Sequence, residues 1–157
     1  MSKIARAARV ASRQRVETLG NGTSAATAKT IAAAETGELY FIDHNHASEL
    51  LITLPPKQDG AYFKFILKTN LTAAGTIKIT SSEAAGGDMV GSVFVQVTGG
   101  ANANSAVVQD TDNTDHQVTI SPDTHQGSYL ECYCDGTTWI MTGHLNSAAV
   151  NDVAFGT

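Results

Sequence analysis

The residues of this chain best suited to metal chemistry are His44, His46 and Glu49. Two imidazoles separated by one residue, followed by a carboxylate, are ligand types that zinc, iron and manganese accept. The same three residues also suit a polar turn between two strands, and we favour that interpretation. We therefore expect no metal cofactor.

The arrangement resembles in part the metal motif of the cupins, a family of β-sandwich metalloenzymes. Gly37 and Gly60 bracket the two histidines. However, only two residues separate His46 from Glu49, Gly37 lies one residue too far upstream, and Gly60 is well outside the expected spacing. The later Pro-x-Gly-x-x-His segment is missing, since residues 122–125 (PDTH) lack its glycine. A cupin-like metalloenzyme is thus the third of our functional hypotheses.

A second group of potential ligands is acidic. Asp110, Asp112 and Asp115 lie close together in the sequence and supply the oxygen ligands that Ca²⁺ prefers. The segment lacks the glycine at the sixth position and the glutamate at the twelfth that define an EF-hand loop. A solvated hairpin loop is the favoured interpretation, with a calcium site as the alternative.

The two cysteines, Cys132 and Cys134, are expected on one face of a single strand, too far apart for a disulfide bond. The chain contains no second cysteine pair to complete a zinc site, so we expect buried, reduced thiols. The sequence also lacks a nucleophile elbow, a phosphate-binding loop and a dinucleotide-binding fingerprint. We expect no catalytic residues and no enzymatic activity.

Positive charge is concentrated near the N-terminus. Of the ten Lys and Arg residues, five precede the first acidic residue, Glu17, whereas from residue 16 onward five Lys face fifteen Asp and Glu. The formal net charge of -5 therefore divides into about +5 and about -10. The acidic body argues against nucleic acid as a partner, and the basic arm predicts a contact with an acidic protein surface. The arm residues are Lys3, Arg6, Arg9, Arg13 and Arg15.

A β-hairpin is predicted over residues 127–143. Asp135 and Gly136 suit a two-residue type I′ turn, which would place Cys134 opposite Thr137 and Cys132 opposite Trp139. Because side chains alternate between the two faces of a strand, four residues then share a core face. This core hairpin consists of Leu130, Cys132, Trp139 and Met141.

The predicted fold is an all-β, jelly-roll-like sandwich of about nine strands, with a Greek-key or immunoglobulin-like sandwich as the alternative. The expected strands are 38–43, 49–54, 62–68, 76–80, 90–97, 105–109, 117–121, 128–134 and 137–142. Residues 1–36 are predicted to be a separate arm and linker, with a short helix over 1–19, and residues 37–157 the sandwich domain. An edge strand near 27–31 is the alternative within the linker. No apolar run is long enough to span a bilayer, so we expect no membrane partner.

Four segments carry a resemblance to a known group of proteins: 51–56 (LITLPP), 60–67 (GAYFKFIL), 75–80 (GTIKIT) and 134–143 (CDGTTWIMTG). Their order over residues 37–144 resembles that of small all-β virion proteins of tailed bacteriophages, especially head decoration (cement) proteins. The resemblance implies a homotrimer that is made in the host cytoplasm and binds the major capsid protein on the capsid exterior. A tail-fibre or receptor-binding module that contacts cell-surface glycans is the second hypothesis.

Overall fold

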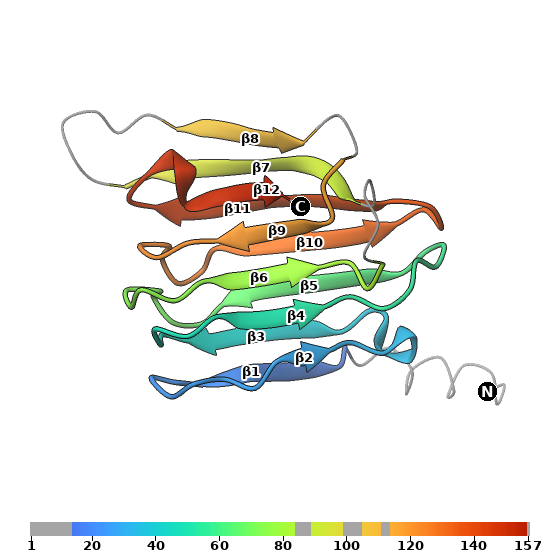
Figure 1. The fold of residues 1–157 in the computed structure, drawn as a ribbon, viewed down its shortest axis with the longest axis horizontal. Coiled ribbons are helices and arrows are strands. Elements are labelled where there is room, and N and C mark those ends of the chain that lie inside the picture. The colour runs from blue at the N-terminus through green and yellow to red at the C-terminus, as the bar shows by residue number, and fades with distance from the viewer. Residues whose placement is uncertain (1–13, 84–88, 99–104, 111–113, 157) are drawn as a thin grey trace, which may run out of the picture.

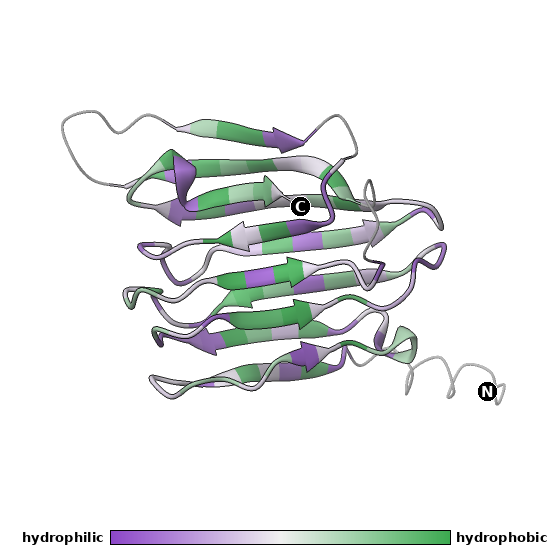
Figure 2. Ribbon diagram, viewed as in Figure 1, coloured by the Kyte–Doolittle hydropathy of each residue, from purple (hydrophilic) through white to green (hydrophobic). Residues whose placement is uncertain are grey.

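The computed structural model describes residues 14–83, 89–98, 105–110 and 114–156. These residues form two β-sheets packed face to face around one hydrophobic core (Figure 1). Hydrophobic and hydrophilic residues alternate along the strands, as a half-buried sheet requires (Figure 2). The only helices among the described residues are two 3₁₀ turns, η1 (Ala33–Glu35) and η2 (Val150–Asp152), and no helix there is long and apolar enough to cross a membrane. The predicted all-β sandwich is confirmed.

The larger sheet, called sheet A here, has seven strands in the order β1-β3-β5-β10-β11-β7-β8. The smaller, sheet B, has five in the order β12-β9-β6-β4-β2. Sheet A contains β1 (Val16–Gly22), β3 (Leu39–His44), β5 (Tyr62–Leu67), β7 (Met89–Val97), β8 (Ala106–Asp110), β10 (Tyr129–Cys134) and β11 (Trp139–Ser147). Sheet B contains β2 (Lys29–Thr30), β4 (Leu50–Thr53), β6 (Ile77–Thr80), β9 (Gln117–Ile120) and β12 (Val153–Gly156).

The first six strands alternate between the two sheets. Each pair of consecutive strands, one in sheet A and the next in sheet B, forms a rung, and the three rungs stack in parallel. The later strands close the sandwich differently: β10 runs antiparallel on β5, and β9 runs antiparallel on β6. Each strand turns alternate side chains inward, so stacking the rungs produces a continuous core.

The jelly-roll connectivity is not confirmed. A jelly roll is an antiparallel fold of two Greek keys, whereas five strand pairs here are parallel: β1–β3, β3–β5, β2–β4, β4–β6 and β7–β11. The physical reason is that each early strand crosses to the other sheet instead of turning back on itself. Parallel neighbours need such long crossovers, whereas antiparallel neighbours can be joined by a tight turn.

The predicted division at residue 36 is wrong for the described part of the N-terminal segment. Residues 16–22 form strand β1 rather than part of a helix, and the predicted linker contains β2, at the position of the alternative edge strand. Leu19 and Ile31 contribute to the core. Residues 16–36 are thus the first rung of the sandwich, while residues 1–13 lie outside the described residues.

The hairpin prediction is right about the faces and wrong about the register. All four core-hairpin residues are fully buried. However, Cys134 pairs with Trp139 and Cys132 with Met141, a shift of two residues that leaves every side chain on the same face. The turn is longer because Asp135 Oδ1 accepts hydrogen bonds from the backbone N–H groups of Thr137 and Thr138, each at 2.8 Å. This Asx-type turn replaces the predicted type I′ turn.

Candidate functional site

The structure does not bring the predicted metal ligands together. His44 is buried at the end of β3, and its Nε2 lies 2.9 Å from the carbonyl oxygen of Ser48. His46 Nδ1 accepts a hydrogen bond of 3.0 Å from the Ser48 backbone N–H. Glu49 is paired instead with Lys78, at 3.0 Å. The two histidines thus support a turn between β3 and β4, as in the favoured interpretation, whereas Glu49 contacts strand β6.

The other sequence-predicted groups are placed only in part. Asp110 ends β8 and Asp115 is described, but Asp112 lies outside the described residues. Cys132 and Cys134 are both buried free thiols. Burial, with a smaller contribution from Cys134, raises the pKa of the Cys132 thiol well above its ordinary value, so this thiol stays protonated and unreactive at neutral pH. Of the predicted arm residues only Arg15 is described; its side chain is 72% exposed and lies 3.4 Å from Glu38.

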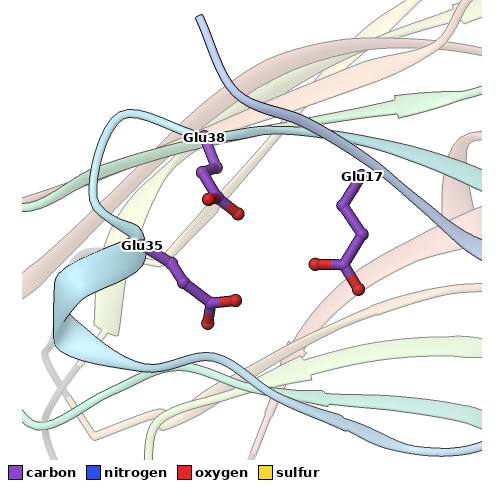
Figure 3. Close-up of side chains that lie close together, drawn as sticks. All are labelled: Glu17, Glu35 and Glu38. Carbon is purple, nitrogen blue, oxygen red and sulfur yellow. The ribbon is translucent and has the colours of Figure 1, made fainter. Parts of the chain in front are cut away.

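One carboxylate cluster was not anticipated from the sequence. Glu17, Glu35 and Glu38 point toward a common space beside the first rung (Figure 3). Their ligand atoms lie within 4.8 Å of one another, the only group of three or more His, Cys, Asp or Glu side chains that meets this condition among the residues the structure describes. Lys29 Nζ is 2.8 Å from Glu17 and 2.8 Å from Glu35. One ammonium group thus pairs with two of the three carboxylates and offsets one of their charges.

The cluster holds the pieces of the first rung together. Burial is the largest single influence on Lys29 and Glu35, and it opposes their charged forms. The hydrogen bonds and charges of Glu17 and Glu35 together outweigh it and raise the pKa of Lys29. Hydrogen bonds from Lys29 and the Ala32 N–H, with the charges of Lys29 and Arg15, outweigh it for Glu35 and lower the pKa of that carboxyl. Glu38 accepts a hydrogen bond of 3.1 Å from Tyr40. Because Glu17 is on β1, Lys29 on β2 and Glu35 on η1, one ammonium group connects three elements that have little apolar surface of their own.

We expect Lys29→Met to lower the free energy of unfolding by about 1–2 kcal/mol, because it leaves neighbouring carboxylates without their cation while keeping a side chain of similar length. Urea denaturation measures the change. Lys78→Met is the matched control, since Lys78 lies on sheet B and has one carboxylate partner, Glu49. Equal losses for the two variants would contradict the role of the cluster in holding the first rung.

The most extensive candidate site is the outer face of sheet A, meaning the side of this sheet that points away from the core. Six large hydrophobic side chains are exposed among the described residues, and five of them lie on this face. The five are Val16 (57%), Val107 (53%), Phe94 (41%), Tyr133 (40%) and Ile140 (40%). Buried neighbours on the same strands, such as Val93 and Met141, point into the core, so the exposure follows from strand alternation.

Strand register organises this face into rows that cross the sheet. One row, called the apolar row, crosses all seven strands, and a second, the polar row, runs beside it. The apolar row is Thr18, Phe41, Ile66, Tyr129, His144, Phe94 and Val107. The polar row is Val16, Leu39, Lys64, Glu131, Thr142, Ser92 and Gln109. A shorter third row contains Tyr62, Tyr133, Ile140 and Val90.

Aromatic rings and ion pairs contact one another across these rows. The rings of Tyr62 and Tyr133 lie 4.9 Å apart, and those of Phe94 and His144 lie 5.2 Å apart. Lys64 Nζ lies 2.7 Å from Glu131 and 4.6 Å from the centre of the Tyr129 ring. The face thus presents planar rings with paired charges between them.

The charges on this face neutralise one another. The hydrogen bond from Lys64 lowers the pKa of Glu131 and raises that of Lys64. The Tyr133 hydroxyl donates to Glu131 at 2.8 Å, which raises the pKa of this tyrosine to about 12. Lys68, which follows β5, pairs with Asp43 at 2.8 Å, and this bond lowers the pKa of Asp43. The charges of these two lysines and two carboxylates therefore cancel, and together they add no net charge to the face.

The lowered pKa of Glu131 predicts a dependence of stability on pH. Because the folded-state value lies below the ordinary 4.5, the pair stabilises the fold above this pH and loses its contribution as the pH falls through the lowered pKa. Glu131→Gln is therefore expected to cost about 0.5–1 kcal/mol near neutral pH and almost nothing in acid. Urea denaturation over a pH series measures both limits. A cost that persists unchanged in acid would show that the glutamate does not act through its charge.

Comparisons with protein families, with curated proteins and with solved structures find no match to this chain. The outer face of sheet A and the first-rung cluster are therefore the features on which a function can be based.

Proposed function

We propose that this chain is a structural virion protein that binds the outer surface of a phage capsid and stabilises it as a decoration (cement) protein. The observation that carries the proposal is the outer face of sheet A, where five of the six exposed large hydrophobic side chains gather. Exposed apolar side chains concentrated on one face are typical of a protein that works through contacts with other proteins. The resemblance of segments 51–80 and 134–143 to phage decoration proteins supports the same class.

A decoration protein stabilises a shell by connecting neighbouring subunits, so it needs more than one contact surface. We propose that the chain acts as a homotrimer, that its main partner is the major capsid protein, and that the basic arm supplies one of the contacts. The arm is shorter than the sequence indicated. Because β1 begins at Val16, residues 20–36 are part of the sandwich and cannot serve as a tether.

The arm contact is tested by changing its charge in the full-length protein. Arg6, Arg9 and Arg13 are replaced by Gln, and binding to undecorated capsids is measured at low and high salt. Since salt screens exposed charges, we expect the variant to bind fewer copies at low salt and to respond less to added salt. The control replaces two body lysines that are not on a strand of sheet A, Lys57 and Lys78, by Gln. Equal occupancy of the arm variant and the wild type at both salt concentrations would exclude the arm as an anchor.

The second candidate function is a tail-fibre or receptor-binding module that contacts cell-surface glycans. The observation in its favour is the Tyr62–Tyr133 ring pair, since Tyr133 is 40% exposed and its hydroxyl is fixed by Glu131. Exposed rings stack on the apolar faces of sugars, and fixed polar groups orient sugar hydroxyls. Binding to a glycan array that is lost in Tyr133→Ala would favour this function. Binding to capsids with no glycan signal would favour decoration.

A further inference from the structure

We infer that copies of this chain associate with one another through the outer face of sheet A. The inference rests on the proposed function, because it names the partner of the surface that carries that function. The inference adds the identity of the contact surface: the outer face of sheet A in one copy contacts the same face of another copy. Three properties of the face support this, namely its composition, its size and its charge.

The composition separates the two outer faces of the sandwich. The outer face of sheet A carries large apolar side chains in each of its three rows, and aromatic rings in two of them. The outer face of sheet B has a single large apolar side chain, Leu51, among polar and small ones in its described strands. Its other described strand residues are Thr30, Thr53, Lys78, Thr80, Gln117, Thr119, Ala154 and Gly156. Burial of the outer face of sheet A against a partner is therefore more favourable in free energy than burial of the outer face of sheet B.

The size of the face suits a stable assembly. Seven strands spaced by about 4.8 Å, each roughly 20 Å long, cover about 700 Å². A standard protein–protein interface buries about 800 Å² on each partner, so the sheet A face alone is close to sufficient. Phe94 and Tyr133 are exposed aromatic residues, the kind of residue that contributes most to binding energy in such interfaces.

The charge of the face indicates a copy of the same chain as its occupant. The whole chain carries a net charge of -5, so two copies repel one another in most orientations. The sheet A face avoids this repulsion, because Lys64 is paired with Glu131 and Lys68 with Asp43. A strongly basic or acidic partner would be matched by a face of opposite charge. A face that is neutral and apolar suits copies of itself around a two-fold or a three-fold axis.

The test is a double variant, Phe94→Lys with Ile140→Lys, in the full-length protein. Both side chains are exposed, so the core is untouched. We expect the wild type to have the mass of a dimer or trimer by light scattering and sedimentation, and the variant to dissociate at least tenfold more readily while it keeps the wild-type circular dichroism spectrum. Thr80→Lys with Thr119→Lys adds the same charges to the outer face of sheet B and is expected to leave the mass unchanged. A monomeric wild type, or a double variant that keeps the wild-type mass, would overturn the inference.

Binding to undecorated capsids separates this inference from the proposed function. A monomeric wild type that binds capsids, together with a double variant that does not, would assign the face to the capsid protein; the inference would fail while the decoration role stood. An oligomer that dissociates in the double variant but never binds particles would support the inference and overturn the decoration role. An oligomer that binds capsids and dissociates in the double variant would support both.

Discussion

Trp139→Ala is expected to lower the free energy of unfolding by about 3–5 kcal/mol, the usual cost of emptying a buried aromatic site. Trp139 is fully buried where β11 begins, and its ring lies 6.0 Å from that of Phe63 on β5. It also pairs across the hairpin with Cys134. Its removal therefore opens a cavity between strands that cannot easily move together. Chemical denaturation of the wild type and the variant measures the difference.

Two controls separate the cavity from other effects. Val150→Ala changes an exposed hydrophobic residue that lies outside the outer face of sheet A, and it is expected to lower the free energy of unfolding by less than about 1 kcal/mol. Trp139→Phe keeps most of the ring. Among the described residues the buried indole N–H has no hydrogen-bond partner, so this change breaks no hydrogen bond. It is therefore expected to lower the free energy of unfolding less than Trp139→Ala does, because the cavity that it leaves is smaller. Fluorescence typical of a water-exposed indole in the folded protein would contradict the buried position of Trp139.

Gly91→Ala is expected to lower the free energy of unfolding by about 3 kcal/mol, the upper end of the range for overpacking. A Cβ atom at this position would lie 1.9 Å from the carbonyl oxygen of Met141, and the residue has a φ of +151°. The obstacle is backbone, so it cannot move aside without breaking the β7–β11 pairing. Denaturation, together with the hydrogen-exchange protection of β7 and β11, measures the effect.

The matched control for Gly91 is Gly127→Ala. Gly127 also has a positive φ, +85°, but nothing lies within 4 Å of the position that a methyl group would occupy there. The substitution is therefore expected to cost only the strain of the backbone conformation, about 1 kcal/mol. Equal costs for the two substitutions would mean that backbone conformation, rather than the close approach of Met141, makes Gly91 necessary.

The sequence predicts those features that depend on short-range alternation. The core hairpin shows this: its four residues are buried as expected, since a register shift of two does not change the face of any side chain. The register itself was mispredicted because the Asp135 side chain competes for the turn N–H groups, and residue type alone does not decide between a two-residue and a four-residue loop.

The first rung was missed because its residues carry little of the usual strand signal. Residues 20–36 are rich in Ala, Thr and Gly, and such composition is typical of a linker. Their place in the sandwich depends on parallel pairing of β1 with β3 and of β2 with β4, and on Lys29 joining Glu17 and Glu35. A lone lysine between two glutamates was the available signal, but it does not reveal that these residues meet.

The rows on the outer face of sheet A were also beyond prediction. They bring together residues as distant in sequence as Phe41, Tyr129 and Val107. Each strand alone shows only that alternate residues point outward. Which exposed side chains become neighbours depends on the registers of all six strand pairs in the sheet, and these are fixed by the packed core.

The proposed decoration role is tested by the number of copies of this chain in purified phage particles, counted by quantitative mass spectrometry with the major capsid protein as the internal standard. We expect a fixed ratio to the capsid protein that corresponds to occupation of symmetry-related positions over the whole shell. A handful of copies per particle would place the chain in the tail or fibre, and its absence from particles would contradict the decoration role altogether.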